Sequence, residues 1–321
     1  MAPSRILVTG GTGFVGQWLS QDLKRRFPAS QVILAADQAF TADSSPPLYQ
    51  LDVRNRAAVD AAIRSIAPQA VVHLAAISAI AEAQKDPEKS WDVNLNGTRY
   101  LAEAVLSYAR GARFIYVSSS EVYGGTFKTS QGPLNEGALL DPANSYAASK
   151  AAADLLIGQL ARDGLNAIRL RPFNHTGSGQ TERFVIPAFA RQIARIEKEM
   201  QAPLIEVGDL DPCRDFLDVR DVVAAYSKAL IVEDIPHGMI LNIASGIPRR
   251  IGDVLEELIN IGQMKVEIRP NSERVRRADI PVAVGDAAAA RDRLGWSPKI
   301  PWRRTLEDIL DHWRTRVDHG N

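Results

Sequence analysis

A tyrosine and a lysine stand four residues apart in the segment NSYAASK, at Tyr146 and Lys150. Residues at this spacing share one face of a helix, so both side chains would point toward one site. A free phenol has a pKa of about 10, and a neighbouring ammonium favours its phenolate form. One charge at ~4 Å, with an effective dielectric of ~20, contributes ~4 kcal/mol or about three pKa units. We therefore expect the pair to exchange a proton near neutral pH.

Three further polar residues precede this pair in the segment SSSEVYG. Ser119, Ser120 and Glu121 follow the run RFIYV, which predicts a strand, and ligands of parallel sheets bind where strands end. A Tyr-x-x-x-Lys pair alone is more often ordinary helix surface, so its meaning depends on these neighbours. Together they indicate a candidate ligand site beside Tyr146 and Lys150.

A glycine-rich turn near the N-terminus predicts a dinucleotide site. The run RILVTG leads into GTGFVG and then into a helix pattern. Gly10, Gly13 and Gly16 allow a tight turn and close approach of a pyrophosphate. The free N–H groups at the helix start, near Phe14 and Val15, attract its charge. A turn without a ligand is the alternative, but the order of strand, turn, helix and second strand favours a cofactor.

Asp37 bears on which cofactor binds. It ends the second predicted strand, about 20 residues after the glycine turn, where a carboxylate can hold a ribose 2′-hydroxyl. A carboxylate there repels a 2′-phosphate, and the following QAF offers no arginine to neutralise one. We expect NAD(H) to be preferred over NADP(H). A solvated residue at the strand end is the alternative.

The elements that must position these residues alternate between strands and helices. β-branched runs predict strands at RILVTG, QVILAAD, AVVHLAA, RFIYVSSS and NAIRLRPF. Apolar residues at helical spacing predict helices at NRAAVDAAIRSI, NGTRYLAEAVLSYA and SYAASKAAADLLIGQLA. This alternation is typical of an α/β fold with a doubly wound, Rossmann-type parallel sheet.

The pattern becomes less regular after PFNHTGSGQ and predicts a second, smaller α/β domain for the substrate. Helices are expected near 184–198, 219–231, 251–262 and 303–316, with short strands around PLIEVG and MILNIAS. We predict a cofactor-binding domain over 1–172 and a substrate-binding domain over 173–321. Segments at about 216–243 are expected to return to the first domain.

Composition limits the partners. The 321 residues carry 38 Lys+Arg and 38 Asp+Glu, so no basic surplus indicates a nucleic acid or an anionic membrane. No apolar run is long enough to span a bilayer. The single Cys213 and the absence of a signal-peptide pattern indicate a cytoplasmic setting. No His, Cys and Asp residues have metal-ligand spacing, so no metal is expected.

Several segments together resemble a known family. TGGTGFVG, LDV, HLAA, VSSSEVYG, YAASK, RPFN and RDFLDVRD occur in this order and resemble the extended short-chain dehydrogenases/reductases, in particular their nucleotide-sugar enzymes. By this resemblance, the catalytic residues are Ser119, Glu121, Tyr146 and Lys150. It implies that Tyr146 exchanges a proton with a sugar oxygen, that Ser119 orients that oxygen, and that Lys150 binds the nicotinamide ribose and lowers the tyrosine pKa. The resemblance also places further cofactor contacts at Asp52, Val53, Leu74, Ala75 and Ala76.

The resemblance extends to the substrate. PFNHTGSGQ followed by FV is similar to a segment of the GDP-mannose 4,6-dehydratases and of the GDP-4-keto-6-deoxymannose reductases, which implies a GDP-linked hexose. RRADIPVAVGD is similar to their RPxEV segment. The implied substrate contacts are Ser78, Ser119, Ser120, Glu121, Tyr146, Asn174, Val185, Arg214, Arg276 and Asp279. Guanidinium groups suit a diphosphate because they bind it in a fixed geometry.

One position separates the possible reactions. The dehydratases that this chain resembles read Thr-Asp-Glu or Thr-Ser-Glu where it has Ser119-Ser120-Glu121, whereas the reductases show Ser-Ser-Glu. We therefore expect reduction at C4 of a GDP-4-keto-6-deoxyhexose. The carboxylate of Asp37 keeps an NAD-dependent 4-epimerase open, and a 4,6-dehydratase stays a further alternative. A non-catalytic NAD(H)-binding sensor is the alternative of another class. The resemblance also implies a homodimer, formed as a four-helix bundle by helices near 97–109 and 145–162.

Overall fold

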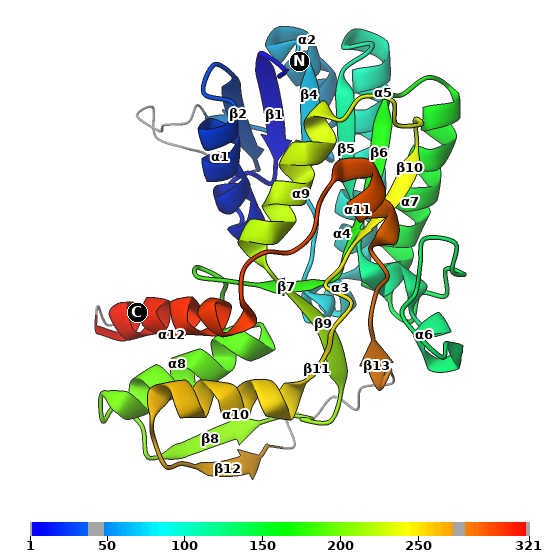
Figure 1. The fold of residues 1–321 in the computed structure, drawn as a ribbon. Coiled ribbons are helices and arrows are strands. Elements are labelled where there is room, and N and C mark those ends of the chain that lie inside the picture. The colour runs from blue at the N-terminus through cyan, green and yellow to red at the C-terminus, as the bar shows by residue number, and fades with distance from the viewer. Residues whose placement is uncertain (1, 38–47, 272–279, 319–321) are drawn as a thin grey trace.

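The centre of the molecule is a parallel sheet of seven strands. The computed structural model describes residues 2–37, 48–271 and 280–318. The strands are ordered β10-β6-β5-β4-β1-β2-β3 (Figure 1). Their bounds are β1 (Arg5–Thr9), β2 (Gln31–Ala36), β3 (Leu48–Gln50), β4 (Ala70–His73), β5 (Arg113–Val117), β6 (Ala167–Pro172) and β10 (Met239–Ile243). The strand order reverses between β1 and β4, which is where open α/β sheets of this kind bind ligands. The doubly wound sheet expected from the sequence is confirmed.

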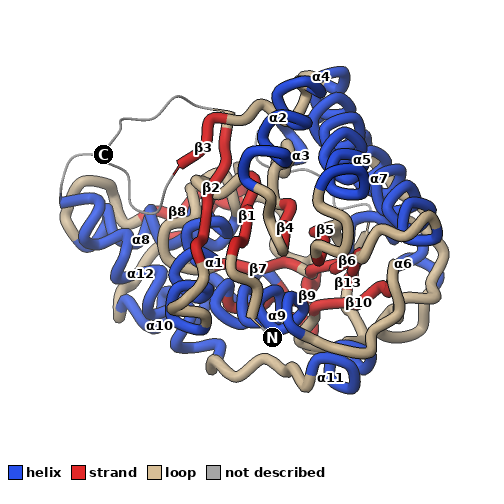
Figure 2. Tube along the Cα trace, turned by 90° about the horizontal axis from the view of Figure 1, so that it is seen from above, coloured by secondary structure: helices blue, strands red, loops and turns tan. Residues whose placement is uncertain are grey.

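Helices cover both faces of this sheet, as Figure 2 shows from above. One face packs against α1 (Phe14–Arg26) and α9 (Val219–Ile231), and the other against α2 (Arg56–Ile66), α5 (Thr98–Tyr108) and α7 (Ser145–Arg162). Side chains of β5 alternate between the two cores, because successive residues of a strand point to opposite faces. Ile115 joins the first core, and Phe114 and Tyr116 join the second, all three with 0% exposure.

Short elements follow the carboxyl ends of β4 and β5. They are α3 (Ile80–Lys85), α4 (Pro87–Trp91), the π-helix η1 (Asp92–Gly97), the 3₁₀ helix η2 (Ser120–Tyr123) and α6 (Thr126–Thr129). None was predicted from the sequence, because a single turn shows no periodic pattern. They shape the edge of the sheet that carries the polar residues.

The later chain builds a second layer beyond this edge, at the bottom of Figure 1. Its strands are β7 (Asn174–Thr176), β9 (Cys213–Asp218), β11 (Pro248–Arg250) and β13 (Val282–Ala283), with β8 (Leu204–Val207) and β12 (Glu267–Pro270) forming a separate pair. Its helices are α8 (Val185–Glu197), α10 (Ile251–Gly262) and α12 (Trp302–Asp318), which share a core centred on Trp313. A last short helix, α11 (Ala288–Leu294), packs against β10 and α9.

The chain enters this second layer and then returns to the sheet. After β9, α9 packs against α1, and β10 pairs in parallel with β6, with Met239 opposite Ile168. Residues 219–243 therefore complete the large sheet and its helical cover. The division into domains 1–172 and 173–321 stays a prediction.

Candidate active site

The glycine turn between β1 and α1 is built for close approach. Gly10 has a φ of +67°, and a Cβ on it would lie 2.7 Å from the backbone nitrogen of Ala75. A Cβ on Gly16 would lie 2.5 Å from the carbonyl oxygen of Gly11. α1 begins at Phe14 with no side chain capping it, so its first N–H groups face outward from the helix start. This cradle, which side chains would fill, fits a pyrophosphate.

The end of β4 lies against this turn. The backbone nitrogen of Leu74 donates to the carbonyl of Thr9 at 3.1 Å, and that of Ala75 donates to the Thr9 hydroxyl at 3.4 Å. Ala76 follows directly and is half-buried. The three residues expected beneath the cofactor thus border the glycine turn.

Asp37 follows β2 and is exposed. Arg54, which sequence reasoning missed, lies within electrostatic reach of it, since Asp37 contributes to the raised pKa of that guanidinium. The larger contribution comes from Asp52, whose carboxylate accepts from Arg54 Nε at 3.0 Å and Nη2 at 2.7 Å. Val53 between them is buried and touches Gly97 of η1, where a Cβ would meet it at 2.6 Å. The segment QAF after Asp37 offers no arginine, but Arg54 comes near Asp37 from the loop after β3.

Ser119 and Tyr146 come together at the carboxyl edge of the sheet. Ser119 caps η2, its hydroxyl accepting from the backbone nitrogen of Glu121 at 3.1 Å. Asn144 caps α7 by accepting from the backbone nitrogen of Ala147 at 2.9 Å, which places Tyr146 in the first turn. The Ser119 side chain is close enough to the Tyr146 phenol to lower its pKa. Both side chains are buried, with 8% exposure each.

Lys150 lies one turn further along α7 and is 3% exposed. Its ammonium donates to the carbonyl of Val117, the last residue of β5, at 2.6 Å. Burial lowers the pKa of this lysine to about 7, and the Asp154 carboxylate opposes the change. The ammonium is therefore directed at the strand end beside Ser119.

The pKa of the Tyr146 phenol differs from the sequence-based expectation. Burial raises it to about 12, the Ser119 hydrogen bond lowers it, and the Glu121 carboxylate raises it. The expected lowering toward neutrality by Lys150 is wrong for this structure, because the argument from spacing left out burial and Lys150 is bonded to Val117. The phenol consequently keeps its proton at neutral pH.

Arg214 on β9 is brought to the same edge from the second layer. Burial raises the pKa of Glu121, and Arg214 partly opposes this. Burial also lowers the pKa of Arg214, and Glu121 raises it. The Arg214 guanidinium donates to the Cys213 carbonyl at 2.8 Å. The structure thus joins the sheet and the second layer through an acidic and a basic group beside Tyr146.

Other predicted substrate residues are more scattered. Asn174 starts β7 opposite Phe216 of β9, and Val185 starts α8 with 37% exposure. Ser78 is exposed after β4, and Ser120 begins η2 and is buried. Among the described residues, no hydrogen bond or ion pair links Ser78 or Val185 to Tyr146. Two predicted contacts lie outside the described residues, namely Arg276 and Asp279.

Asn94, on η1, is a residue that sequence reasoning missed. Its side-chain oxygen accepts from the backbone nitrogen of Ile77 at 2.8 Å, and its amide nitrogen donates to Ser149 Oγ at 3.0 Å. Ser149 in turn donates to the Tyr146 carbonyl at 2.8 Å. Asn94 therefore ties the loop after β4 to the helix that carries the tyrosine and lysine. No spacing in the sequence pointed to it.

His73 ends β4 beneath the site. Its Nδ1 lies 2.7 Å from the Thr9 hydroxyl and its Nε2 lies 2.9 Å from the Thr98 hydroxyl. Thr98 donates its own proton to the Asn94 carbonyl, so its oxygen is left to accept from the imidazole. Burial lowers the pKa of His73 to about 3, and Lys150 lowers it further. The ring is neutral at physiological pH and links β1, β4 and α5.

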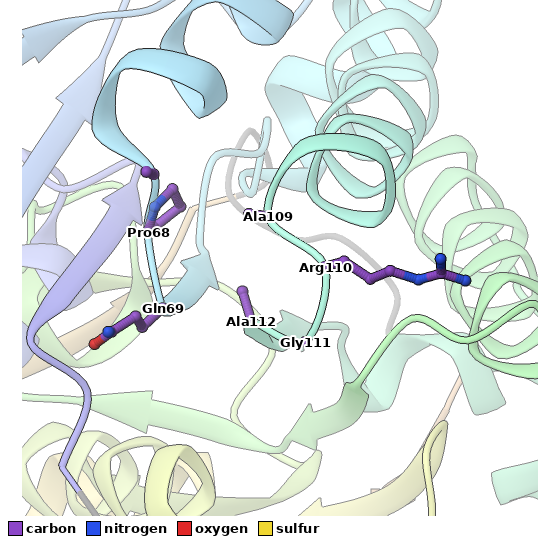
Figure 3. Close-up of a pocket in the computed structure, with 7 residues that line it drawn as sticks. Pro68, Gln69, Ala109, Arg110, Gly111 and Ala112 are labelled. Atoms are coloured by element: carbon purple, nitrogen blue, oxygen red, sulfur yellow. The ribbon is translucent and has the colours of Figure 1, made fainter.

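Two shallow pockets lie away from these residues. One of about 290 Å³ is lined by Ala67, Pro68, Gln69, Ala109, Arg110, Gly111 and Ala112 (Figure 3). It lies between the loops that enter β4 and β5, at the opposite edge of the sheet from Ser119. The other, of about 330 Å³, lies beside α7 and includes Leu155 and His237. Neither pocket is lined by Ser119, Glu121, Tyr146 or Lys150.

Within the described part of the chain, no helix is both long and apolar enough to cross a membrane. No group of three His, Cys, Asp or Glu side chains within it is arranged to hold a metal ion.

Comparison with known proteins gives consistent matches over the whole chain. The family model described as GDP-mannose 4,6 dehydratase matches residues 7–309. The chain is 36% identical to a GDP-6-deoxy-D-mannose reductase of Pseudomonas aeruginosa, covering 98% of each chain. It is 30% identical to a UDP-glucose 4-epimerase of Streptomyces lividans, covering 98% of this chain and 97% of that one.

Solved structures of related proteins also match this chain over nearly its full length. The structure of RMD from Pseudomonas aeruginosa complexed with NADPH matches with a TM-score of 0.84 and 34% identity over 98% of each chain. A UDP-glucose 4-epimerase of Thermus thermophilus in complex with NAD matches with a TM-score of 0.79 and 26% identity, over 97% of this chain and 99% of that one.

Proposed function

Because this chain belongs to the GDP-mannose 4,6-dehydratase family of extended short-chain dehydrogenases/reductases, we propose that it reduces the C4 keto group of a GDP-4-keto-6-deoxyhexose. The observation that carries the proposal is the buried Ser119–Tyr146 pair, whose phenol has a pKa of about 12. Reduction needs an acid that holds its proton until hydride arrives, and this phenol does so at neutral pH.

Each of these residues has a separate role in the proposed reduction. A reduced nicotinamide cofactor, with its pyrophosphate held at the glycine turn, would supply the hydride. Tyr146 gives its proton to the C4 oxygen, and Ser119 orients that oxygen by a hydrogen bond. Lys150, one helical turn further along α7, is proposed to hold the nicotinamide ribose from its place at the Val117 carbonyl. Glu121 beside them has a raised pKa and holds a proton more readily than a free carboxyl group.

The substrate would be anchored from the second layer. Arg214 suits one end of the diphosphate, because its guanidinium lies at the carboxyl edge beside Glu121. Contacts with the rest of the nucleotide and the hexose are proposed at Ser78, Ser120, Asn174, Val185, Arg276 and Asp279. The 36% identity to a GDP-6-deoxy-D-mannose reductase supports a GDP-linked sugar.

The cofactor is proposed to be NADH rather than NADPH. The exposed Asp37 carboxylate disfavours a 2′-phosphate, and the nearby Arg54 guanidinium is already bonded to Asp52. The NADPH complex of the Pseudomonas structure is the contrary observation. The proposed contacts are Gly10, Gly13, Phe14, Val15, Gly16, Asp37, Asp52, Val53, Leu74, Ala75, Ala76, Tyr146 and Lys150.

The reaction is tested by mixing the protein with GDP-4-keto-6-deoxymannose and NADH, following absorbance, and identifying the sugar by NMR. Stoichiometric loss of NADH with formation of a GDP-6-deoxyhexose is the expected result. A matched reaction with NADPH measures cofactor choice, and one without sugar measures background oxidation. If neither cofactor is consumed, the reductase assignment is wrong.

A 4-epimerase is the second candidate, favoured by the 30% identity to a UDP-glucose 4-epimerase and by Asp37. An epimerase oxidises and re-reduces its substrate with retained NAD⁺. Mass spectrometry of nucleotides released from the purified protein distinguishes the two, since retained NAD⁺ together with interconversion of C4 epimers supports the epimerase. The 4,6-dehydratase is less favoured because Ser119 stands where the dehydratases have threonine.

The protein is also proposed to be a cytoplasmic homodimer that pairs α5 and α7 with their copies. Tyr108 on α5 and Leu155 on α7 are large apolar side chains with 40% and 61% exposure. Sedimentation of Leu155→Glu should show dissociation. Leu139→Glu, at a loop position with 74% exposure, is the control that should leave the dimer intact. A monomeric unmodified protein would end this proposal.

A further inference from the structure

The Lys150 ammonium is buried without a carboxylate partner. None of the described carboxylates forms an ion pair with it. The nearest acidic side chain on its own helix, Asp154, accepts hydrogen bonds from Arg169 at 3.0 Å and from Arg171 at 2.9 and 3.0 Å. Burying an ammonium is costly unless other groups replace its hydration. One backbone carbonyl, that of Val117, cannot satisfy three N–H donors.

Tyr116 of β5 supplies a second support. Its ring centroid lies 4.5 Å from Lys150 Nζ, which is cation–π distance. Its hydroxyl donates to the Lys150 backbone carbonyl at 3.3 Å. The side chain is fully buried, with 0% exposure. A single tyrosine therefore contacts both the charged end and the backbone of the lysine.

We propose that Tyr116 is a positioning residue for the proposed reduction, whose ring face keeps Lys150 charged and aimed at the strand end. The ring is electron-rich on its face, and burial strengthens its attraction for an ammonium. The proposal rests on the proposed function for its importance to turnover. Its physical claim about Lys150 is independent of any substrate.

Other charged groups also act on this ammonium. Asp154 on α7 raises the pKa of Lys150, and burial lowers it to about 7. His73 on β4 is neutral, since its pKa is lowered to about 3, so it neither repels nor attracts the ammonium at pH 7. The Tyr146 phenol on α7 is likewise neutral there. The Tyr116 ring is thus a group on β5, beside the Val117 carbonyl, that can favour the charged form of a lysine whose pKa lies near 7.

The test is a titration of Lys150 by ¹³C NMR on protein labelled at lysine Cε, with the signal assigned by Lys150→Met. No substrate or cofactor is added, so the result does not depend on the reaction. Tyr116→Phe keeps the ring and should leave the Lys150 pKa unchanged. Tyr116→Leu removes the ring and should lower that pKa by about one unit.

Phe114→Leu is the matched control. Phe114 lies on the same face of β5 with 0% exposure, and its ring contacts His73 but not Lys150. The Phe114→Leu substitution removes a buried ring as Tyr116→Leu does, and it should leave the Lys150 pKa unchanged. Replacement of Tyr116 by 3,4,5-trifluorophenylalanine keeps the ring shape and weakens its negative face. This variant replaces Tyr116→Leu if the latter does not fold, and it should shift the pKa in the same direction.

The result then extends to turnover. With the sugar and NADH, the alkaline fall of kcat/KM should begin at lower pH in Tyr116→Leu than in Tyr116→Phe. A Lys150 pKa that is equal in the Phe, Leu and trifluorophenylalanine variants would overturn the proposal. So would an equal shift in Phe114→Leu, which would make the effect one of packing alone. A normal NMR result without any NADH consumption would instead count against the proposed function.

Discussion

Arg54 holds the Asp52 carboxylate through three side-chain hydrogen bonds, at 3.0, 3.1 and 2.7 Å, and the Asp37 carboxylate also raises the pKa of its guanidinium. A single guanidinium thus interacts with the carboxylates of Asp52, Asp92 and Asp37 at the edge where an adenine ribose is expected. If one carboxylate is removed, the balance of charge at that edge becomes more positive. Cofactor choice should therefore depend on these residues together and not on Asp37 alone.

Asp37→Ala should raise the affinity for NADPH relative to NADH by about tenfold, because one exposed charge repulsion of about 1.4 kcal/mol is lost. Adding Arg54→Gln should remove that gain, because it removes the cation. Asp37→Ala combined with Arg56→Gln is the control, since Arg56 pairs with Glu103 at 3.0 Å instead. Fluorescence titration measures the affinities. A clear NADPH preference in the unmodified protein would refute the NADH proposal.

Tyr146→Phe removes the transferable proton and keeps the ring, so kcat should fall by at least ~10²-fold. The affinity for NADH should change little, because the phenol is proposed to act on the sugar oxygen. Tyr226→Phe is the control, since Tyr226 is another fully buried tyrosine and its hydroxyl has no hydrogen-bond partner among the described residues. Near-normal turnover of Tyr146→Phe would make another residue the acid.

Ser119→Ala should lower kcat by about 10²–10³-fold, the usual loss when one hydrogen bond to a developing oxyanion is removed. It should also raise the pKa of the phenol further, because the Ser119 hydrogen bond lowers it. Ser119→Thr keeps the hydroxyl and should restore most of the activity. Steady-state kinetics over a range of pH decide the matter. An equal loss in the alanine and threonine variants would show that the shape of the site matters and not the hydroxyl.

Stability should fall with acid because of His73. The folded pKa of about 3 lies below the unfolded value of about 6.5, so the unfolded chain binds more protons between these pH values. The contribution of His73 is fully present above pH ~6.5 and is lost as pH falls toward 3, by up to about 5 kcal/mol. Urea unfolding at pH 7 and pH 5 should show a smaller difference in His73→Gln. His237→Gln, at an exposed position, should keep the original difference.

Asp154→Asn should destabilise the fold by roughly 3–5 kcal/mol, since it leaves two buried guanidinium groups without their carboxylate. Arg171 Nη2 lies 2.9 Å from Asp154, and Arg171 also donates to the Tyr123 hydroxyl at 3.0 Å. Asp163→Asn, at the exposed end of the same helix, is the control and should change stability little. Denaturant midpoints measure both variants. A loss below about 1 kcal/mol would mean that the introduced amide finds new partners.

The residues predicted from sequence were those fixed by local pattern. The glycine turn after β1 and the first turn of α7 each lie within one short segment, so spacing pointed to Gly10 and Tyr146, whereas the resemblance gave Ser119 its role. Arg54 was missed because it lies in a loop, and Asn94 because it lies in the short π-helix η1; neither has a periodic sequence pattern. The predicted shift of the Tyr146 pKa had the wrong direction, because spacing in the sequence gives distances along a helix but not the depth of burial. Arg214 was placed by resemblance, and the fold shows how β9 carries it there.

The return of the chain through α9 to β10 also sets an order of events during synthesis on the ribosome. β6 has no neighbour on its outer side until β10 pairs with it, and β10 ends at Ile243. A nascent chain of only 172 residues would present the outer edge of β6 and leave the α1 face without α9. Unpaired strand edges promote aggregation, so such a fragment would need protection until some 70 further residues had emerged. The cofactor-binding half is therefore not a unit that gene fusion could transplant by cutting after β6.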